Sequence, residues 1–173
     1  TISPGDTATF TVAPKPGLTA KTNPNTVKLL FYSTERESVS LTVRCTVSEA
    51  PTYILEAFPS SLTFEELYEG YLPPAGETVT LSNTGTGALE VQLPVSAHFD
   101  IAPGEGWSGN VASLAPGESA EVLVTPKAGF AAGTYQESLS FNTDRPGVGA
   151  QVSASFQVKQ YGDIIITPAE ITV

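Results

Sequence analysis

The sequence of 173 residues is poor in positive charge, cysteine and histidine, and it has no methionine. Only 8 Lys and Arg residues stand against 18 Asp and Glu residues, which gives a formal net charge of -10. A chain of this sign repels the phosphates of nucleic acids and anionic lipids. We therefore expect no nucleic-acid partner, and other partners to be neutral or basic.

The single cysteine, Cys45, excludes an internal disulfide, so the redox compartment cannot be inferred from pairing. In "LTVRCTV", Leu41, Val43, Cys45 and Val47 alternate with polar residues, which is the period of a half-buried strand. We expect Cys45 to point inward as a small apolar side chain. The alternative is a reactive or metal-binding thiol, but no His or second Cys lies near it in the sequence.

Long apolar runs are also missing. No stretch approaches the roughly 18 apolar residues of a membrane helix, and no basic-then-apolar signal peptide opens the chain. We expect no membrane insertion. Because the sequence starts at Thr1 and lacks Met, we expect it to be part of a longer polypeptide, whose other parts could carry a signal peptide and an anchor.

Thr, Ser, Val, Gly and Pro are abundant instead, and no apolar periodicity has helical spacing. This composition predicts an all-β protein with frequent turns. Seven or so short strands in about 100 residues are typical of an immunoglobulin-like sandwich. We expect these strands at residues 62–66, 77–83, 88–93, 98–102, 119–125, 134–142 and 149–158, with Ala120, Val122 and Val124 facing inward and Glu121, Leu123 and Thr125 outward.

The chain repeats itself. "ISPGDTATFTVAPKPGL" (2–18) aligns without a gap with "LAPGESAEVLVTPKAGF" (114–130). Further on, "VKLLF" (27–31) aligns with "ESLSF" (137–141), and "SLTVRCTV" (40–47) with "QVSASFQV" (151–158), which places Cys45 opposite Phe156. The tail "TPAEITV" (167–173) resembles "FPSSLTF" (58–64).

This alignment gives a repeating unit of about 110 residues. We expect residues 1–50 to be the C-terminal half of an immunoglobulin-like repeat and 51–160 to be a complete repeat. Residues 161–173 would be the first strand of a further repeat, or an inter-domain or donor strand. The segments near "VSEAPTY" and "VKQYGD" would set the angle between repeats.

Several motifs predict local structure. In "ISPGD" and "LAPGES", Pro fixes φ and Gly takes a turn position that strains a side chain. "SNTGTG" (82–87) predicts a tight hairpin turn with positive φ. Pro126 ends strand pairing because it has no N–H. We expect Phe130 and Tyr135 to cap the core, with the Tyr135 hydroxyl bonding the backbone as in a tyrosine corner.

In order, the "P-x-x-L-x-F" strand, "VTLSNTGTGAL", "LAPGESAEVLV", "P-K-A-G" and "GTYQESLSF" resemble the ASPM/SPD-2/Hydin (ASH) type of immunoglobulin-like domain, which is related to major sperm protein and PapD-like sandwiches. "TPKAGFAAGTY" is similar to tandem repeats of large extracellular proteins of Gram-positive bacteria. The resemblance implies antiparallel immunoglobulin-like β-sandwich repeats in tandem.

The same resemblance implies a non-enzymatic structural, spacer or interaction module of a large bacterial extracellular or cell-surface protein, without a cofactor. Its partners would be the neighbouring repeats of the same polypeptide and a host or cell-surface protein or glycan. The shared residues are turn and core residues, so they specify a fold and no chemistry.

The best local candidate for recognition is "APGEGWSGN" (102–110), which holds the only Trp. Glycines surround Trp107 and strand alternation is missing, so a surface loop is predicted. An exposed indole stacks on sugars or anchors protein interfaces, with Glu105 and Asn110 as neighbouring ligand contacts. The alternative is that Trp107 folds back and covers the open end of the sandwich.

The only histidine, His98, lies near Ser96 and Asp100 in the sequence. These are the residue types of a catalytic set in which Ser is the nucleophile, His the base and Asp the orienting acid. On a strand these three residues share a face by simple alternation, so we expect a solvent-facing strand histidine. Gly85 and Gly87 lack the Lys and the helix of a P-loop. No catalytic or cofactor-binding residue is predicted.

Glu65, Glu66 and Glu69 could bind a hard cation, but they lack the spacing of a calcium loop, and Asp144 stands alone. We expect a solvated acidic face and assign no metal ligand. Calcium bound between repeats stays an open alternative.

Half a sandwich exposes its inner face to water. We expect upstream chain to complete residues 1–50. The alternative is that "DIIITPAEITV" of another molecule adds to the open edge, which would build head-to-tail strand-complemented filaments.

Overall fold

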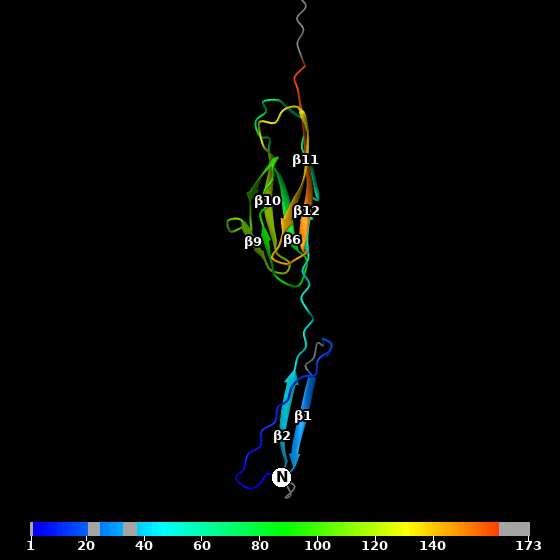
Figure 1. Ribbon diagram of the computed structural model, residues 1–173, viewed down its shortest axis with the longest axis vertical. Coiled ribbons are helices and arrows are strands. Elements are labelled where there is room, and N and C mark those ends of the chain that lie inside the picture. The colour runs from blue at the N-terminus through cyan, green and yellow to red at the C-terminus, as the bar shows by residue number, and fades with distance from the viewer. Residues whose placement is uncertain (1, 21–24, 33–37, 163–173) are drawn as a thin grey trace, which may run out of the picture. The chain divides into compact units, whose positions relative to one another are not determined.

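The computed structural model describes residues 2–20, 25–32 and 38–162. The chain divides into two compact units, Thr1–Ala50 and Pro51–Val173, here called unit 1 and unit 2 (Figure 1). The described residues form twelve strands and no helix, and so no helix among them could span a membrane. The predicted all-β class is confirmed.

The described residues of unit 1 form one antiparallel pair of strands. Strand β1 (Asn25–Tyr32) pairs with β2 (Ser38–Cys45) from Asn25↔Cys45 to Tyr32↔Ser38. Towards the end of β2, Val43 and Cys45 are half-buried whereas their neighbours Arg44 and Thr46 are exposed. This alternation confirms the predicted inward direction of Cys45.

Unit 2 is a β-sandwich of ten strands in its described residues. They are β3 (Leu55–Phe58), β4 (Ser61–Thr63), β5 (Leu67–Tyr68), β6 (Glu77–Asn83), β7 (Leu89–Gln92), β8 (Phe99–Pro103), β9 (Val111–Leu114), β10 (Ser119–Pro126), β11 (Gly133–Asn142) and β12 (Gly149–Lys159). One sheet has the order β3-β6-β10-β8, and the other has the order β11-β12-β4 with β5 also on β12. Strand β9 pairs with β7, and an isolated bridge joins Val91 of β7 to Thr143, the residue after β11.

Most predicted strands are found within one or two residues of their expected bounds. The predicted strand 62–66 is wrong in extent, because β4 ends at Thr63 and the separate strand β5 begins at Leu67. Strands β3 and β9 were not predicted. Both have four residues, and an alternating pattern of that length is a weak signal.

The core lies between the two sheets and is filled by their inward side chains. On β10, Ala120, Val122 and Val124 are buried while Glu121 and Leu123 are exposed, as the alternation predicted. Aromatic side chains complete this core. The ring centroid of Phe99 lies 5.9 Å from that of Phe64 and 5.5 Å from that of Phe156.

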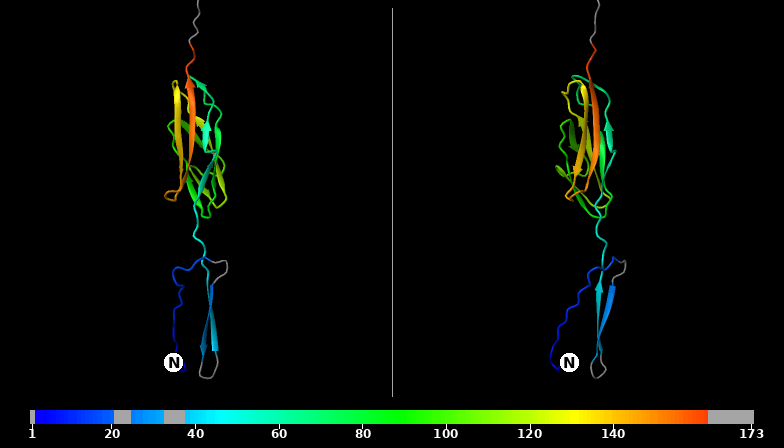
Figure 2. Two further views of the ribbon diagram at one scale, coloured as in Figure 1. Left: turned by 90° about the vertical axis from the view of Figure 1, so that its right-hand side faces the viewer. Right: turned by 45° about the vertical axis from the view of Figure 1, so that its right-hand side comes forward.

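The first and last strands of the second sheet run parallel, although an antiparallel sandwich was predicted. Strand β12 pairs in parallel with β4 from Ser153↔Ser61 to Ser155↔Thr63, and with β5 at Val158↔Leu67. Parallel strands start at the same end of a sheet, so unit 2 begins near Pro51 at one end and leaves after Lys159 at the opposite end (Figures 1 and 2). We call these the Pro51 end and the Lys159 end.

The repeated motifs form the same turns in both units. Asp6 N donates to Ser3 O over 2.9 Å, and Glu118 N donates to Ala115 O over 3.0 Å. The central glycines, Gly5 and Gly117, have φ of 87° and 84°. Pro followed by Gly with positive φ is the pattern of a type II turn, as predicted for both motifs.

Candidate functional site

The loop that holds Trp107 connects β8 to β9 and follows the edge of β10. Gly104 N donates to Glu121 O over 2.8 Å, and Glu121 N donates to Glu105 O over 2.9 Å. A Cβ on Gly106, whose φ is 85°, would lie 3.0 Å from backbone atoms of the β10 region. Backbone contacts therefore hold the first part of this loop against the sheet.

The indole of Trp107 is half-buried and packs against the core. Its Nε1 atom is buried and has no hydrogen-bond partner among the residues that the structure describes. The indole is thus folded back against the core and only partly accessible, whereas its covering the open end of the sandwich stays a prediction. Glu105 and Asn110 are exposed, and ligand contact by these residues stays a prediction.

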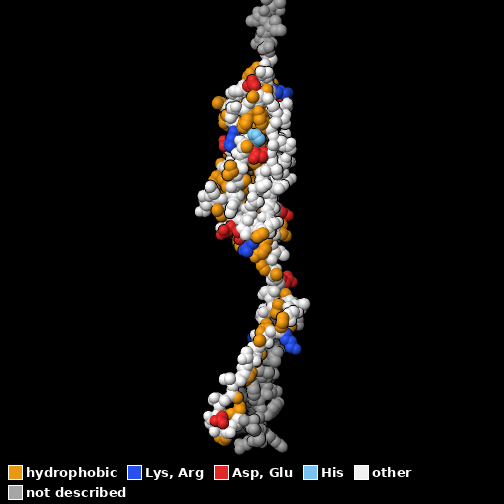
Figure 3. All heavy atoms as spheres, viewed as in Figure 1, with side chains coloured by type: hydrophobic (Ala, Val, Ile, Leu, Met, Phe, Trp, Pro, Cys, Tyr) orange, Lys and Arg blue, Asp and Glu red, His pale blue; other side chains and the backbone are white. Residues whose placement is uncertain are grey.

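His98 is not the solvent-facing strand residue that was predicted. Strand β8 starts only at Phe99, and the imidazole is half-buried, 5.4 Å from the ring of Phe130 and 5.5 Å from that of Tyr135 between centroids. Figure 3 shows the pale-blue imidazole between apolar side chains and an acidic side chain. The cause is a local turn, because Ser96 Oγ accepts hydrogen bonds from His98 N and Phe99 N over 3.2 and 2.9 Å and ends the strand alternation.

The carboxylate beside His98 belongs to Glu137 of β11, and not to Asp100. Ser96 Oγ donates to Glu137 Oε2 over 2.7 Å, and Ala97 N and His98 N donate to the two carboxylate oxygens over 3.3 and 3.2 Å. His98 Nδ1 lies 3.2 Å from Oε2 without the alignment of a hydrogen bond. Because the Ser96 hydroxyl bonds the carboxylate and not the imidazole, this cluster lacks the order of a Ser-His-acid set.

Sequence reasoning missed Glu137 because it lies 39 residues from His98, on a strand where it looks like any outward polar residue. Burial raises the pKa of its carboxyl, but hydrogen bonds from Ser96 Oγ, His98 N and Ala97 N, with the charge of His98, lower that pKa by more. The ionised carboxylate therefore anchors the loop before β8. Lys127 Nζ adds a hydrogen bond of 2.7 Å to Ser96 O.

An aromatic corner stands next to this cluster. The Tyr135 hydroxyl donates to Ala131 O over 2.9 Å, four residues upstream. The Tyr135 ring stacks on Phe156 with centroids 5.0 Å apart, and Phe130 meets the same ring at 5.8 Å. The predicted corner, with Phe130 and Tyr135 on the core and the hydroxyl on the backbone, is confirmed.

The acidic segment 65–69 is not simply solvated. Glu66 Oε2 accepts from Lys159 Nζ over 2.6 Å, and Glu69 Oε1 accepts from Ala132 N over 2.8 Å. The hydrogen bond to Glu66 raises the pKa of Lys159. The two carboxylates thus tie this segment to separate parts of the unit, and within the described ranges no group of three His, Cys, Asp or Glu side chains is placed to hold a metal ion.

The prediction for "SNTGTG" is wrong in its mechanism. Gly85 and Gly87 have no positive φ, and the strands on either side, β6 and β7, belong to different sheets. These glycines are needed for close approach, since a Cβ on Gly85 would overlap Thr52 O and a Cβ on Gly87 would overlap the ring of Tyr53. A single sequence does not show which distant segment will lie against a glycine.

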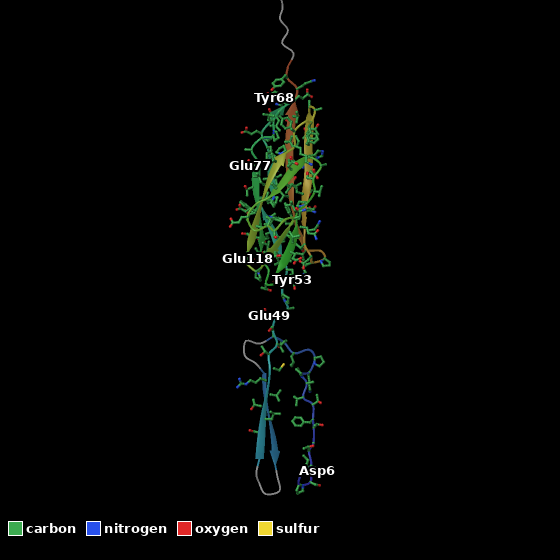
Figure 4. All side chains as sticks on the ribbon, turned by 90° about the vertical axis from the view of Figure 1, so that its left-hand side faces the viewer. Asp6, Glu49, Tyr53, Tyr68, Glu77 and Glu118 are labelled. Atoms are coloured by element: carbon green, nitrogen blue, oxygen red, sulfur yellow. The ribbon has the colours of Figure 1, made fainter. Side chains whose placement is uncertain are left out.

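The loop therefore holds the start of unit 2. Thr86 N and Gly87 N donate to Thr52 O over 2.8 and 2.9 Å, and Thr52 N donates to Thr86 Oγ1 over 2.9 Å. The guanidinium of Arg145 lies 4.5 Å from the centre of the Tyr53 ring. Figure 4 shows Tyr53 at this end of the sandwich and Tyr68 at the other.

The Lys159 end is held in a similar way. Glu69 N donates to Lys159 O over 2.9 Å, and the ring of Tyr161 stacks on that of Tyr68 at 5.0 Å. Both segments that lead into and out of the sandwich are thus fixed to its body by hydrogen bonds and ring contacts.

No protein-family model and no curated protein matches the chain. Among solved structures it is similar to the ASH/PapD-like domain (PapD-like domain 7) of human CEP192, with 17% identity and a TM-score of 0.45, over 62% of this chain and 87% of that one. A protein of Porphyromonas gingivalis W83 has 12% identity and a TM-score of 0.45, over 81% of this chain and 69% of that one.

The E. coli chaperone DraB is a further similar structure, with 13% identity and a TM-score of 0.41, over 62% of this chain and 55% of that one. The descriptions of two of these structures agree with the predicted resemblance to an ASH/PapD-like domain, and the β-sandwich itself is seen in the two sheets of unit 2. At these identities the likeness extends to no ligand, partner or activity.

Proposed function

We propose that this chain is a non-enzymatic spacer module of a large bacterial extracellular or cell-surface protein. One observation carries the proposal: β12 runs parallel to β4 and β5, so the chain passes through unit 2 from one end to the other. The 11 residues of β12 alone span about 36 Å at the usual rise of a strand. A unit of this kind lengthens a polypeptide by a fixed amount.

The fixed segments at both ends support the same role. A spacer transmits direction only if the chain cannot swivel where it meets the sandwich. Thr52 and Tyr53 are held at the Pro51 end, and Lys159 and Tyr161 at the Lys159 end. The matched turns at Gly5 and Gly117 support the further proposal that unit 1 belongs to a second copy of the same repeat.

The spacer proposal is tested by length. A second copy of residues 51–160 is inserted after residue 160, and the maximum dimension of both proteins is measured by small-angle X-ray scattering. We expect the insertion to add about 40 Å, one strand length and a short linker. A much smaller increase would mean that consecutive units fold back on one another, and the spacer role would be rejected.

A second candidate role rests on the exposed inner side of unit 1. Val12, Pro14, Leu18, Val43 and Cys45 line an apolar hollow of about 570 Å³. In this role the tail of another copy covers the hollow, and copies join head to tail. Light scattering decides between the spacer role and head-to-tail assembly. Concentration-dependent polymers that disappear on deletion of residues 161–173 support head-to-tail assembly, whereas a monomer at all concentrations rejects it.

The location at the cell surface has its own test. Antibodies raised against the chain are applied to intact and to permeabilised cells that produce the full-length protein. Equal labelling of both supports an extracellular position. Labelling only after permeabilisation contradicts it, whatever the result of the length measurement.

A further inference from the structure

We propose that unit 2 is built to bear tension along its long axis, and that the parallel contact of β4 and β5 with β12 is the element that resists the pull. This inference rests on the proposed spacer role, because a spacer between two attached parts is loaded through its two ends. It adds a property, resistance to force, that length alone does not require.

The direction of the strands relative to the load is the first argument. The chain reaches β4 from the Pro51 end and leaves β12 at the Lys159 end, so opposite pulls act along these two neighbouring strands (Figure 2). The hydrogen bonds of a parallel pair are evenly spaced and slanted between the two strands, so a pull along the strand axis loads all of them together. A pull across the strands opens them one after another.

The bonds that join the first and last strands are the second argument. Ser153 N donates to Ser60 O and Phe64 N donates to Ser155 O, each over 3.0 Å. Towards the Lys159 end the contact continues through Glu69 N to Lys159 O and through the ion pair of Glu66 with Lys159. The contact therefore extends beyond the three residues of β4.

The burial of the contact is the third argument. Water competes with exposed hydrogen bonds and weakens their resistance to shear, whereas a covered ladder is shielded. Leu62 of β4 is 5% exposed, and Ala154 and Phe156, which lie on β12, are 0% and 2% exposed. Strand β12 is also held on its other side by β11, from Gly149 to Val158.

Strand β3 precedes this contact in the path of the load. Among the described strands it pairs only with β6, over four residues from Leu55↔Asn83 to Phe58↔Thr80, and three of its four side chains are at least partly exposed. The loop 84–87 adds the bonds to Thr52 and Ile54. This segment is the weaker part, so its release leaves the parallel contact to bear the force.

The test is single-molecule pulling of the full chain in two directions. Handles are attached through cysteines introduced at Pro51 and Gly162 for the axial pull, and at Pro51 and Pro146 for the transverse pull, with Cys45→Ser in both proteins. Pro146 lies on the exposed tip between β11 and β12, at the Pro51 end. We expect the axial rupture force to be roughly twofold or more above the transverse one. Equal forces in the two directions would overturn the proposal.

A matched pair of variants locates the resisting element. Leu62→Ala removes the buried anchor of β4, and Leu89→Ala removes the same atoms from β7, where Leu89 is 1% exposed. Both variants lose equilibrium stability, which Trp107 fluorescence in urea measures. Only Leu62→Ala is expected to lower the axial rupture force by more than this loss explains. If both variants lower the axial rupture force in proportion to their loss of stability, the contact of β4 with β12 is not the element that resists the pull, and the proposal is overturned.

The two proposals fail separately. The insertion of a second unit could give the expected increase of length while the rupture forces are equal in both directions. This result would support the spacer role and reject the force-bearing contact. Absence of the length increase removes the spacer role itself.

Discussion

Aligned residues of the two units share their turns but differ in burial. Val12 is 44% exposed in unit 1, whereas its counterpart Val124 is 0% exposed in unit 2. Cys45 is half-buried, and its counterpart Phe156 is 2% exposed. The additional cover of Phe156 comes from the facing sheet, for example from Phe99. Local sequence therefore determines turns and alternation, while burial depends on strands supplied by the rest of the sandwich.

The largest expected effect is on the core of unit 2. Phe156→Ala removes a ring that contacts Phe99, Phe130 and Tyr135, and we expect it to lower the free energy of unfolding of unit 2 by about 3–5 kcal/mol. The aligned change Cys45→Ala should cost about 0.5 kcal/mol or less. Urea unfolding followed by Trp107 fluorescence reports unit 2, and circular dichroism reports the whole chain. Similar losses for the two variants would contradict the contrast in burial.

A smaller effect concerns Glu137, whose aligned residue in unit 1 is the uncharged Val27. The pKa of the Glu137 carboxyl is lower in the folded state, so its ionised form stabilises unit 2 above the unfolded pKa, near 4.5, and this contribution is lost as the pH falls through the folded value. Glu137→Gln should lower the stability of unit 2 by about 1–3 kcal/mol at pH 7. The difference between wild type and variant should shrink below about pH 4.5.

The measurement is a series of urea titrations between pH 7 and pH 3. Glu56→Gln is the matched control, because Glu56 is an exposed glutamate of the same unit. A difference between wild type and Glu137→Gln that stays constant over this range would show that the charge of Glu137 does not matter.

The smallest effect compares the two equivalent turns. A Cβ added at Gly117 or at Gly5 would have no other atom within 4 Å. Gly117→Ala and Gly5→Ala therefore reduce the free energy of unfolding only through backbone strain at positive φ, by about 1–2 kcal/mol. Only Gly117→Ala should shift the transition seen by Trp107 fluorescence. Gly162→Ala, which has free space and no positive φ, serves as the unchanged control. A shift with Gly5→Ala would reveal that unit 2 depends on unit 1.

The sequence was sufficient for features that depend on neighbours along the chain. The alternation in β10, the turns at Gly5 and Gly117 and the corner at Tyr135 were all predicted, because each follows from residues a few positions apart. Features that depend on distant segments were missed or misread. Glu137 beside His98 and Thr52 against Gly85 are of this kind, since only the folded topology brings them together.

The parallel pairing of β4 with β12 also determines when unit 2 can form. Ser61 is synthesised early and its partner Ser153 late, so β4 cannot pair with β12 until nearly all of unit 2 has been synthesised. Contacts between such distant residues fold slowly, and the waiting strand stays open to wrong partners. Unit 2 therefore closes only after its final strand, β12, has left the ribosome.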